Sequence, residues 1–292
     1  MCLILAVALL VVNLFGGGSA QAGVGHEDQT GLGSVRVASV VGVVEVRRED
    51  GDWARLEPGR ELSEGDEVRT GDFSQTILRP KHGATLTLTP NTSFTIGDET
   101  PEVSRFTLGV GRVSADIERR RDRTFEFGSG TGGARADSQG GEFHLIADSE
   151  GLLGVVTREG EVGLSSEGRR VVVPAGRQAV AMPGKPPSEP LAIPQEVFLQ
   201  VEWPEERTKE PSVTVAGRTD VGARVRLGDQ SVDVGHDGRF EVEVTLFEGE
   251  NRLFLLAEDG AGNIRRTTSP LVVREVERRP PLRLEVEGSV WE

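Results

Sequence analysis

Short apolar runs that alternate with turn residues are the feature of this sequence that most restricts its fold. Such runs recur from Ser34 to Ala181, for example EVRTG, SQTILR, ATLTLT and RRVVVPAG, and each is bounded by Gly, Asp, Asn or Pro. Alternating Val, Ile, Thr and Leu are typical of strands, and the bounding residues favour tight turns. The chain also has 38 glycines and 15 prolines. We therefore expect an all-β protein, with an antiparallel β domain of sandwich or roll type over residues 34–182.

A proline-rich segment separates this region from a second β-rich region. Five prolines lie between Pro183 and Gln195, which predicts a semi-rigid linker over residues 183–210. Alternating apolar residues follow, and about seven short strands over residues 211–274 fit a small immunoglobulin-like β-sandwich. The charged tail, residues 275–292, is either a last edge strand or disordered, and the sequence leaves both open.

The charge of the chain argues against two classes of partner. The 33 basic residues against 47 acidic residues give a formal net charge of −14. A protein with this charge repels phosphate backbones and anionic lipid surfaces. We therefore expect no nucleic-acid partner.

The N-terminal segment has the pattern of an export signal. The run MCLILAVALLVVNLF is apolar except for Asn13, and GGGSAQAG follows it. Ala20 and Ala22 match the A-x-A pattern of a signal-peptidase site, so residues 1–22 form the predicted signal peptide and Gly23 the mature N-terminus. Because the apolar run is too short for an uninterrupted span, we expect no stable membrane span after processing and a periplasmic or secreted location. The processed chain would contain no cysteine, so no disulfide is expected.

The first β region resembles the FecR periplasmic domain, the ferric-dicitrate sensor module. The resemblance extends over roughly Val35 to Ala181, and its most specific part is the segment Gly65, Asp66, Val68, Arg69, Thr70 and Gly71. Further residues that carry it are Gly42, Val44, Val46, Trp53, Leu56, Gly59, Leu62, Leu86, Leu88, Pro90, Thr92, Ile96, Leu108, Gly109, Val113, Gly141, Phe143, Val156, Gly160, Val162, Ala175, Gly176 and Gln178. Complete FecR-type sensors place an anti-sigma segment before a membrane helix, whereas this sequence begins with the export signal.

The second β region is similar to bacterial immunoglobulin-like modules of secreted polysaccharide-active enzymes and surface proteins. The residues that carry this similarity occupy turn and core positions, and they are Val215, Gly217, Gly222, Val225, Asp237, Gly238, Phe240, Gly249, Asn251, Asp259, Gly262 and Asn263. A match of this kind implies a fold and not an activity.

Motifs that suggest cofactor, metal or catalytic chemistry have simpler structural explanations. GSGTGG, residues 128–133, matches G-x-G-x-x-G, but no helix-forming segment follows, so a flexible β-loop is favoured. The four histidines, His26, His82, His144 and His236, lack metal-site spacing, and no G-x-S-x-G elbow is present. We therefore predict no catalytic residue, no metal site and no cofactor. Asp237 with Gly238, and Asp259 with Asn263, could bind calcium, but tight turns need the same residues.

Three polar segments remain as candidate binding features. Arg119 to Arg123, RRRDR, either contacts an anionic envelope polymer or is a solvated hairpin tip. Asn91 begins an N-glycosylation sequon by pattern, for which a chance match is favoured. Thr85, Thr87 and Thr89 alternate with Leu86 and Leu88, which predicts leucines in the core and a solvated threonine face.

These observations favour a non-catalytic, exported binding or scaffold protein of the envelope, whose partner is an envelope protein or a polysaccharide. An alternative is a periplasmic sensor related to FecR regulators that passes a signal to a separate membrane protein. A third, weaker alternative is an accessory part of a polysaccharide-active enzyme. The sequence identifies no ligand-binding residue.

Overall fold

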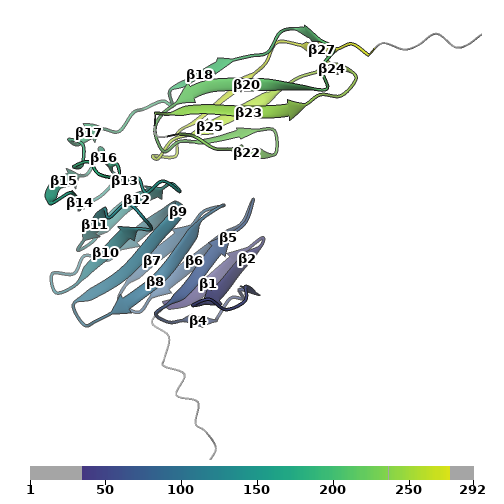
Figure 1. The fold of residues 1–292 in the computed structure, drawn as a ribbon. Helices are drawn as coiled ribbons and strands as arrows, with labels where there is room; N and C mark the ends of the chain where they lie inside the picture. The colour runs from purple at the N-terminus through teal and green to yellow at the C-terminus, as the bar shows by residue number, and fades with distance from the viewer. Residues whose placement is uncertain (1–34, 236, 277–292) are drawn as a thin grey trace, which may run out of the picture. The chain divides into compact units, whose positions relative to one another are not determined.

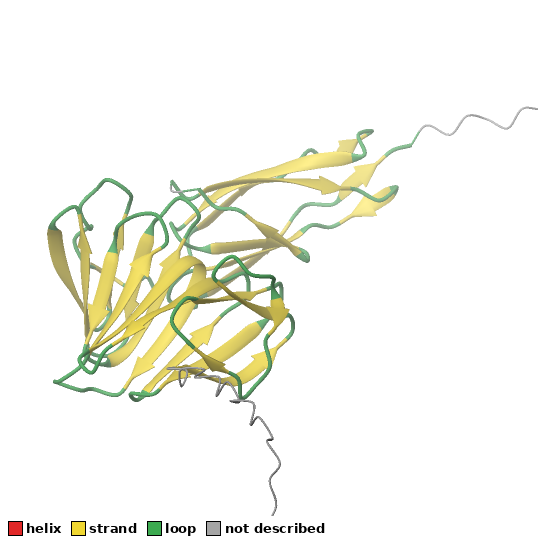
Figure 2. Cartoon of the chain, turned by 60° about the horizontal axis from the view of Figure 1, so that its bottom comes forward, coloured by secondary structure: helices red, strands yellow, loops and turns green. Residues whose placement is uncertain are grey.

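The computed structural model describes residues 35–235 and 237–276, and it confirms the predicted all-β class for them. These residues form 27 strands and contain no helix, and Figure 2 shows strands joined by loops. The expected signal peptide with Ala20, Ala22 and Gly23 lies outside the described residues, as do residues 277–292 of the expected tail. Within the described residues there is accordingly no helix that could span a membrane.

The first β block, β1 to β17, consists of two hydrogen-bonded layers that share one strand (Figure 1). In spatial order the first layer contains β17 (Leu191–Ala192), β16 (Arg177–Ala181), β13 (Leu153–Thr157), β12 (Gly141–Ala147), β9 (Val103–Ile117), β7 (Ala84–Leu88), β6 (Gln75–Pro80), β1 (Val35–Val41) and β4 (Glu61–Leu62). The second layer contains β3 (Ala54–Arg55), β2 (Val44–Arg48), β5 (Asp66–Thr70), β8 (Ser93–Glu99), β9, β10 (Thr124–Ser129), β11 (Arg135–Ser138), β14 (Glu161–Ser166) and β15 (Arg169–Pro174).

The long strand β9 passes from one layer to the other. Its first half pairs with β8 and β10, and residues 111–117 pair with β7 and β12. Gly111 lies at this change of partners with φ +103°, and a Cβ there would lie 2.6 Å from the Thr92 Cα. Only glycine fits such a position without strain.

One ladder of the first block differs from the expected antiparallel pattern. β10 pairs with β9 in parallel, with Thr124 opposite Val103. Residues 118–123 therefore connect the end of β9 in the first layer to the start of β10 in the second. The segment RRRDR is thus a crossover link and not the tip of a two-stranded hairpin.

The inner faces of both layers contribute to one hydrophobic core. Three phenylalanine rings stack within it: the centroid distance is 5.4 Å for Phe94–Phe106 and for Phe106–Phe127, and the Phe143 ring meets Phe127 edge-on at 5.9 Å. Such ring pairs stabilise a core beyond the area that they bury. Two layers around one core make the first block a sandwich, which the spacing of the strands alone left undecided.

The second β block, β18 to β27, has its own core, which shares no residue with the first. One sheet contains β18 (Leu199–Glu202), β20 (Ser212–Thr219) and β23 (Arg239–Thr245). A second contains β22 (Gln230–Val232), β21 (Arg224–Leu227), β25 (Phe254–Glu258) and β26 (Ile264–Thr268), and a third contains β19 (Arg207–Thr208), β27 (Val272–Arg274) and β24 (Gly249–Asn251). β19 and β27 pair in parallel.

The range expected to be a linker, residues 183–210, contains three paired strands. β17 pairs with β16, β18 with β20, and β19 with β27. Val197 and Leu199 are buried in the second core. The second block therefore begins before residue 211, because apolar residues that follow Pro194 can still enter a core. Residues 183–190 form no strand.

Candidate functional site

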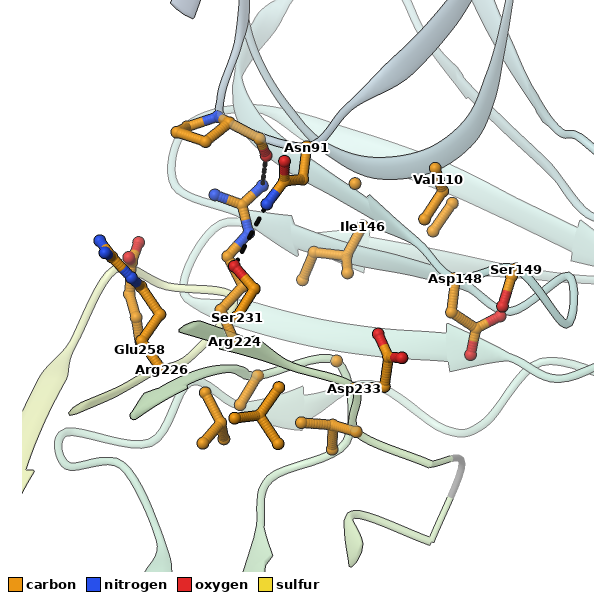
Figure 3. Close-up of a pocket in the computed structure, with 18 of the residues that line it drawn as sticks. Asn91, Val110, Ile146, Asp148, Ser149, Arg224, Arg226, Ser231, Asp233 and Glu258 are labelled. Atoms are coloured by element: carbon orange, nitrogen blue, oxygen red, sulfur yellow. Dashed lines mark hydrogen bonds between the residues drawn. The ribbon is translucent and has the colours of Figure 1, made fainter. Parts of the chain in front are cut away.

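A cleft of about 530 Å³ lies where turns of the first β block meet strands of the second. The first block contributes the turns after β5, β7 and β12 and the bend of β9, and the second contributes β21, β22 and part of β25. Figure 3 shows side chains from both blocks pointing into this space. Loops held by rigid sheets are common positions for binding residues.

An ion pair with a buried arginine and a partly exposed glutamate connects the two blocks beside this cleft. The Arg112 guanidinium, on β9, donates from Nη1 to Glu258 Oε1 on β25 at 2.7 Å. Arg112 is 4% exposed, and its Nε and Nη2 have no hydrogen-bond partner. Burial lowers the pKa of Arg112, although the carboxylates of Glu258 and Asp259 oppose this effect. The cation is therefore only partly compensated by its surroundings.

A second arginine, Arg224 on β21, anchors the end of β7 to the second block. Its Nη2 donates to Thr89 Oγ1 and, at 3.1 Å, to the Pro90 carbonyl. Burial and, to a smaller extent, the positive charge of Arg112 lower the pKa of Arg224 to about 10, with Glu258 opposing them. One carboxylate thus faces two guanidinium groups at this end of the cleft.

The opposite end of the cleft is acidic, and its middle is apolar. In Figure 3, Asp148 and Asp233 lie away from Arg224 and Glu258. Ile146 lies between these groups, and Val110 lies on the side of Asp148. Asp148 Oδ1 accepts the backbone N–H groups of Glu150 and Leu152, which fixes the turn that carries it. An apolar floor with convergent polar groups is the usual chemistry of a ligand site.

Two further contacts join the walls of the cleft. Asn91 Nδ2 donates to Ser231 Oγ of the second block at 3.3 Å and, within the first block, to Asp72 Oδ1 at 3.0 Å. The Arg226 guanidinium lies over the Phe73 ring, 4.2 Å from its centroid. Asn91 has φ 56°, a conformation that asparagine tolerates better than most residues. The sequon asparagine is therefore a turn residue that takes part in the junction.

A hydrogen-bonded group of Ser114, His144 and Arg158 lies next to the ion pair, and the sequence did not predict it. His144 Nδ1 lies 2.8 Å from Ser114 Oγ, and Arg158 Nε donates to His144 Nε2 at 3.0 Å. Because Nε2 accepts this bond, the proton of the neutral ring is on Nδ1, which donates to the serine. Burial, together with the positive charges of Arg158 and Arg112, lowers the pKa of His144 to about 4. In this tautomer the ring cannot take the proton of Ser114.

The threonine row has two environments. Leu86 and Leu88 are fully buried, as expected. Thr85 and Thr87 are partly exposed on the outer face of the first layer. Thr89, directly after β7, donates from Oγ1 to the Arg112 carbonyl at 3.2 Å and accepts from Arg224. The second block therefore covers one end of a row that was expected to be solvated throughout.

The other sequence candidates serve local structure. The Gly128–Gly133 segment joins β10 to β11, and no helix follows it. Asp259 Oδ1 accepts the N–H groups of Ala261 and Asn263. Asp237 Oδ1 accepts the N–H of Arg239. Both aspartates therefore act in turns. Among the described residues no group of three or more His, Cys, Asp or Glu is placed to hold a metal ion, and His26 and His236 lie outside them.

Comparison with known proteins identifies no family. No protein-family profile matches the chain, and no curated protein matches it. Two structures of a proposed anti-sigma factor from Parabacteroides distasonis are similar at 16% and 17% identity, each with a TM-score of 0.37 over 43% of this chain. The chain spans 57% of the length of that protein.

Two further solved structures are similar at lower scores. The fibronectin(III)-like modules of Clostridium thermocellum CbhA align at 13% identity with a TM-score of 0.23, over 68% of this chain and 100% of theirs. Domains 3–5 of the extracellular part of Drosophila OTK align at 12% identity with a TM-score of 0.22, over 80% of this chain and 86% of theirs. Similarities at these scores assign neither a family nor an activity.

Proposed function

We propose that the protein is a non-catalytic binding or scaffold protein of the bacterial cell envelope, exported by residues 1–22 and located in the periplasm or secreted. The cleft between the two β blocks carries the proposal, because it combines an apolar floor with charged groups at both ends. Its partner is an envelope protein or a polysaccharide. Nucleic acid is excluded from the proposal by the net charge of −14.

A FecR-type assignment for the first β block is part of this proposal. Residues that carry the resemblance, such as Val44, Val68 and Leu86, are fully buried. Gly59 and Gly65 have φ +88° and +85°, where glycine is favoured. The resemblance therefore falls on positions that the fold itself requires, which supports a shared architecture and leaves the ligand open.

The immunoglobulin-like assignment of the second block rests on similar positions. Gly222 and Gly238 have φ +76° and +77°. Asn251 is buried and bonds the backbone of Phe247 and Gly249. These are turn and core roles, so they support the fold and identify no ligand.

The chemistry of the cleft favours a ligand with an apolar body and a positive group. Asp233 and Asp148 would face the positive group, and Val110 and Ile146 would contact the apolar part. A lysine or arginine side chain of a protein partner combines both properties on one group.

Site-specific photo-crosslinking in the mature chain, Gly23–Glu292, tests the proposal. A crosslinker at Val110, which is 39% exposed in the cleft, is expected to capture one envelope partner. The same crosslinker at Val43, 62% exposed and outside the cleft, is the matched control. Val110→Trp should fill the cleft and reduce capture. Capture from both positions alike, or a partner retained in full by Val110→Trp, would contradict the assignment of the site.

A sensor function is the second candidate, and the polar contacts of the junction beside the cleft favour it. The blocks have separate cores and are joined beside the cleft by the ion pair Arg112–Glu258 and by hydrogen bonds such as Asn91–Ser231. Polar interfaces within a chain commonly permit relative motion. A ligand that prefers one arrangement would shift the population of the two blocks.

Distance measurements between the blocks separate the two candidates. The single cysteine, Cys2, would be removed with the signal peptide, so Val43→Cys and Phe247→Cys can carry a dye pair. Both positions are exposed, at 62% and 83%. If the protein is a sensor, the energy transfer between the two dyes should change when the partner identified by crosslinking is added in purified form. If it is a scaffold, the energy transfer should stay the same.

A further inference from the structure

A groove of about 620 Å³ on the first β block is lined by four arginines. Arg119, Arg120 and Arg121 come from the crossover link between β9 and β10, and Arg170 comes from β15. Two acidic residues, Asp137 and Glu161, also line it. Four cations against two carboxylates leave a local excess of positive charge in a chain whose net charge is −14. This groove lies within the first block and is separate from the cleft.

The backbone that carries the three consecutive arginines is held in place. Arg120 N–H donates to the Gln139 carbonyl at 2.9 Å. Gly140 lies so close to the Arg119 Cα that a side chain there would collide with it. Arg123 is 3% exposed, and its Nη1 donates to Ser104 Oγ at 2.8 Å. Since the link is anchored at both ends, its exposed arginines lose less backbone freedom on binding than those of a free loop would.

The fourth arginine is also oriented. The Arg170 guanidinium lies over Gly163, where a Cβ would overlap it, and it forms an ion pair with Asp137. Its side chain remains 51% exposed. A guanidinium group has five N–H donors, so a single carboxylate leaves donors free for a ligand.

From this arrangement we propose that the groove binds a short segment of a linear acidic polysaccharide through its carboxylates. Arginine binds carboxylates in a bidentate manner, and several arginines along a groove match a chain with repeated acidic groups. Thr124 and Gln139 supply further polar side chains. The lining contains no aromatic residue, so recognition depends on charge and hydrogen bonding and not on stacking of sugar rings.

Two other polyanions fit the surroundings of the groove less well. Exposed acidic residues adjoin its lining in the sequence, namely Glu118, Asp122 and Glu159. A nucleic acid extends well beyond a groove of this size and would meet these carboxylates. A membrane presents a flat surface, which a concave lining contacts poorly. The experiment below therefore includes a nucleic acid and an anionic membrane as competing ligands.

The experiment measures binding of an oligogalacturonate to the full chain at low salt, with neutral dextran as the comparison. Binding of the oligogalacturonate is expected to weaken steeply as salt is added. Arg119→Gln/Arg120→Gln/Arg121→Gln should reduce the affinity at least about tenfold, because three charged contacts are lost. The matched control, Arg55→Gln/Arg60→Gln/Arg79→Gln, removes the same charge from exposed sites outside the groove and should stay within about twofold.

A single variant keeps the test decisive if the groove triple variant does not fold. Arg170→Gln changes one exposed side chain and should also weaken binding by several-fold. The proposal is wrong if wild type does not bind oligogalacturonate, if both triple variants lose affinity equally, or if Arg170→Gln binds as wild type does. Tighter binding of single-stranded DNA or of anionic vesicles than of oligogalacturonate would also overturn it.

Discussion

The Arg112–Glu258 pair gives the sharpest test of how the two blocks are joined. Glu258→Gln keeps the size of the side chain and removes its charge. Arg112 is 4% exposed, and its Nε and Nη2 have no hydrogen-bond partner. In the variant its charge stays buried, and the side chain that it contacts at position 258 is neutral. Removing one member of a buried pair generally costs about 3–5 kcal/mol. The Glu258 side chain is 31% exposed and glutamine can still accept a bond, so we expect about 2–3 kcal/mol.

Arg112→Met should have a smaller effect than Glu258→Gln, although it removes the more buried residue. Methionine takes away the cation together with its two unpartnered donors, and the partly exposed Glu258 can be hydrated. We expect a change within about 1 kcal/mol of zero. In the double variant, Glu258→Gln should cause almost no further loss of stability beyond that of Arg112→Met.

Urea denaturation and calorimetry of all four proteins provide the measurement. Trp53 lies in the first block and Trp203 in the second, so fluorescence follows both blocks. If the junction opens before either block unfolds, Arg112 gains water, and the transitions of the two blocks should separate in Glu258→Gln. A larger loss for Arg112→Met than for Glu258→Gln, or additive losses in the double variant, would refute the reasoning.

Three further predictions concern the first block and the connection to the second. Leu88→Ala should cost about 2–5 kcal/mol, because Leu88 is fully buried, whereas Thr85→Ser/Thr87→Ser should cost about 1 kcal/mol or less, as urea midpoints would show. The pKa of His144 is about 4 in the folded protein and about 6.5 in the unfolded chain, so the unfolded chain binds the proton first as the pH falls. The contribution of neutral His144 to the free energy of unfolding is therefore complete above about pH 6.5 and is lost as the pH falls toward about 4. An NMR titration midpoint for His144 near 6.5 would contradict this. Limited proteolysis should first cut between Met182 and Pro211, within the strand-free residues 183–190, and an earlier cut inside a block would disagree.

The local sequence pattern was sufficient to predict the all-β class and much of the hydrophobic core of the first block. Alternation placed Leu86 and Leu88 inside because side chains of a strand point to opposite faces in turn. Turn chemistry explained Asp237 and Asp259, since their carboxylates accept backbone N–H groups two to four residues away. These features depend on neighbours in the chain, and the sequence by itself determined them.

Tertiary structure decided the topology and both candidate sites. The parallel pairing of β10 with the first half of β9 makes the arginine segment a crossover link. Arg112 and Glu258 are 146 residues apart in sequence, and no local periodicity relates them. Alternation marks Arg112 as outward-facing on β9, yet the second block buries it. A residue that faces outward from one sheet becomes buried only when another sheet covers it, and that depends on contacts distant in sequence.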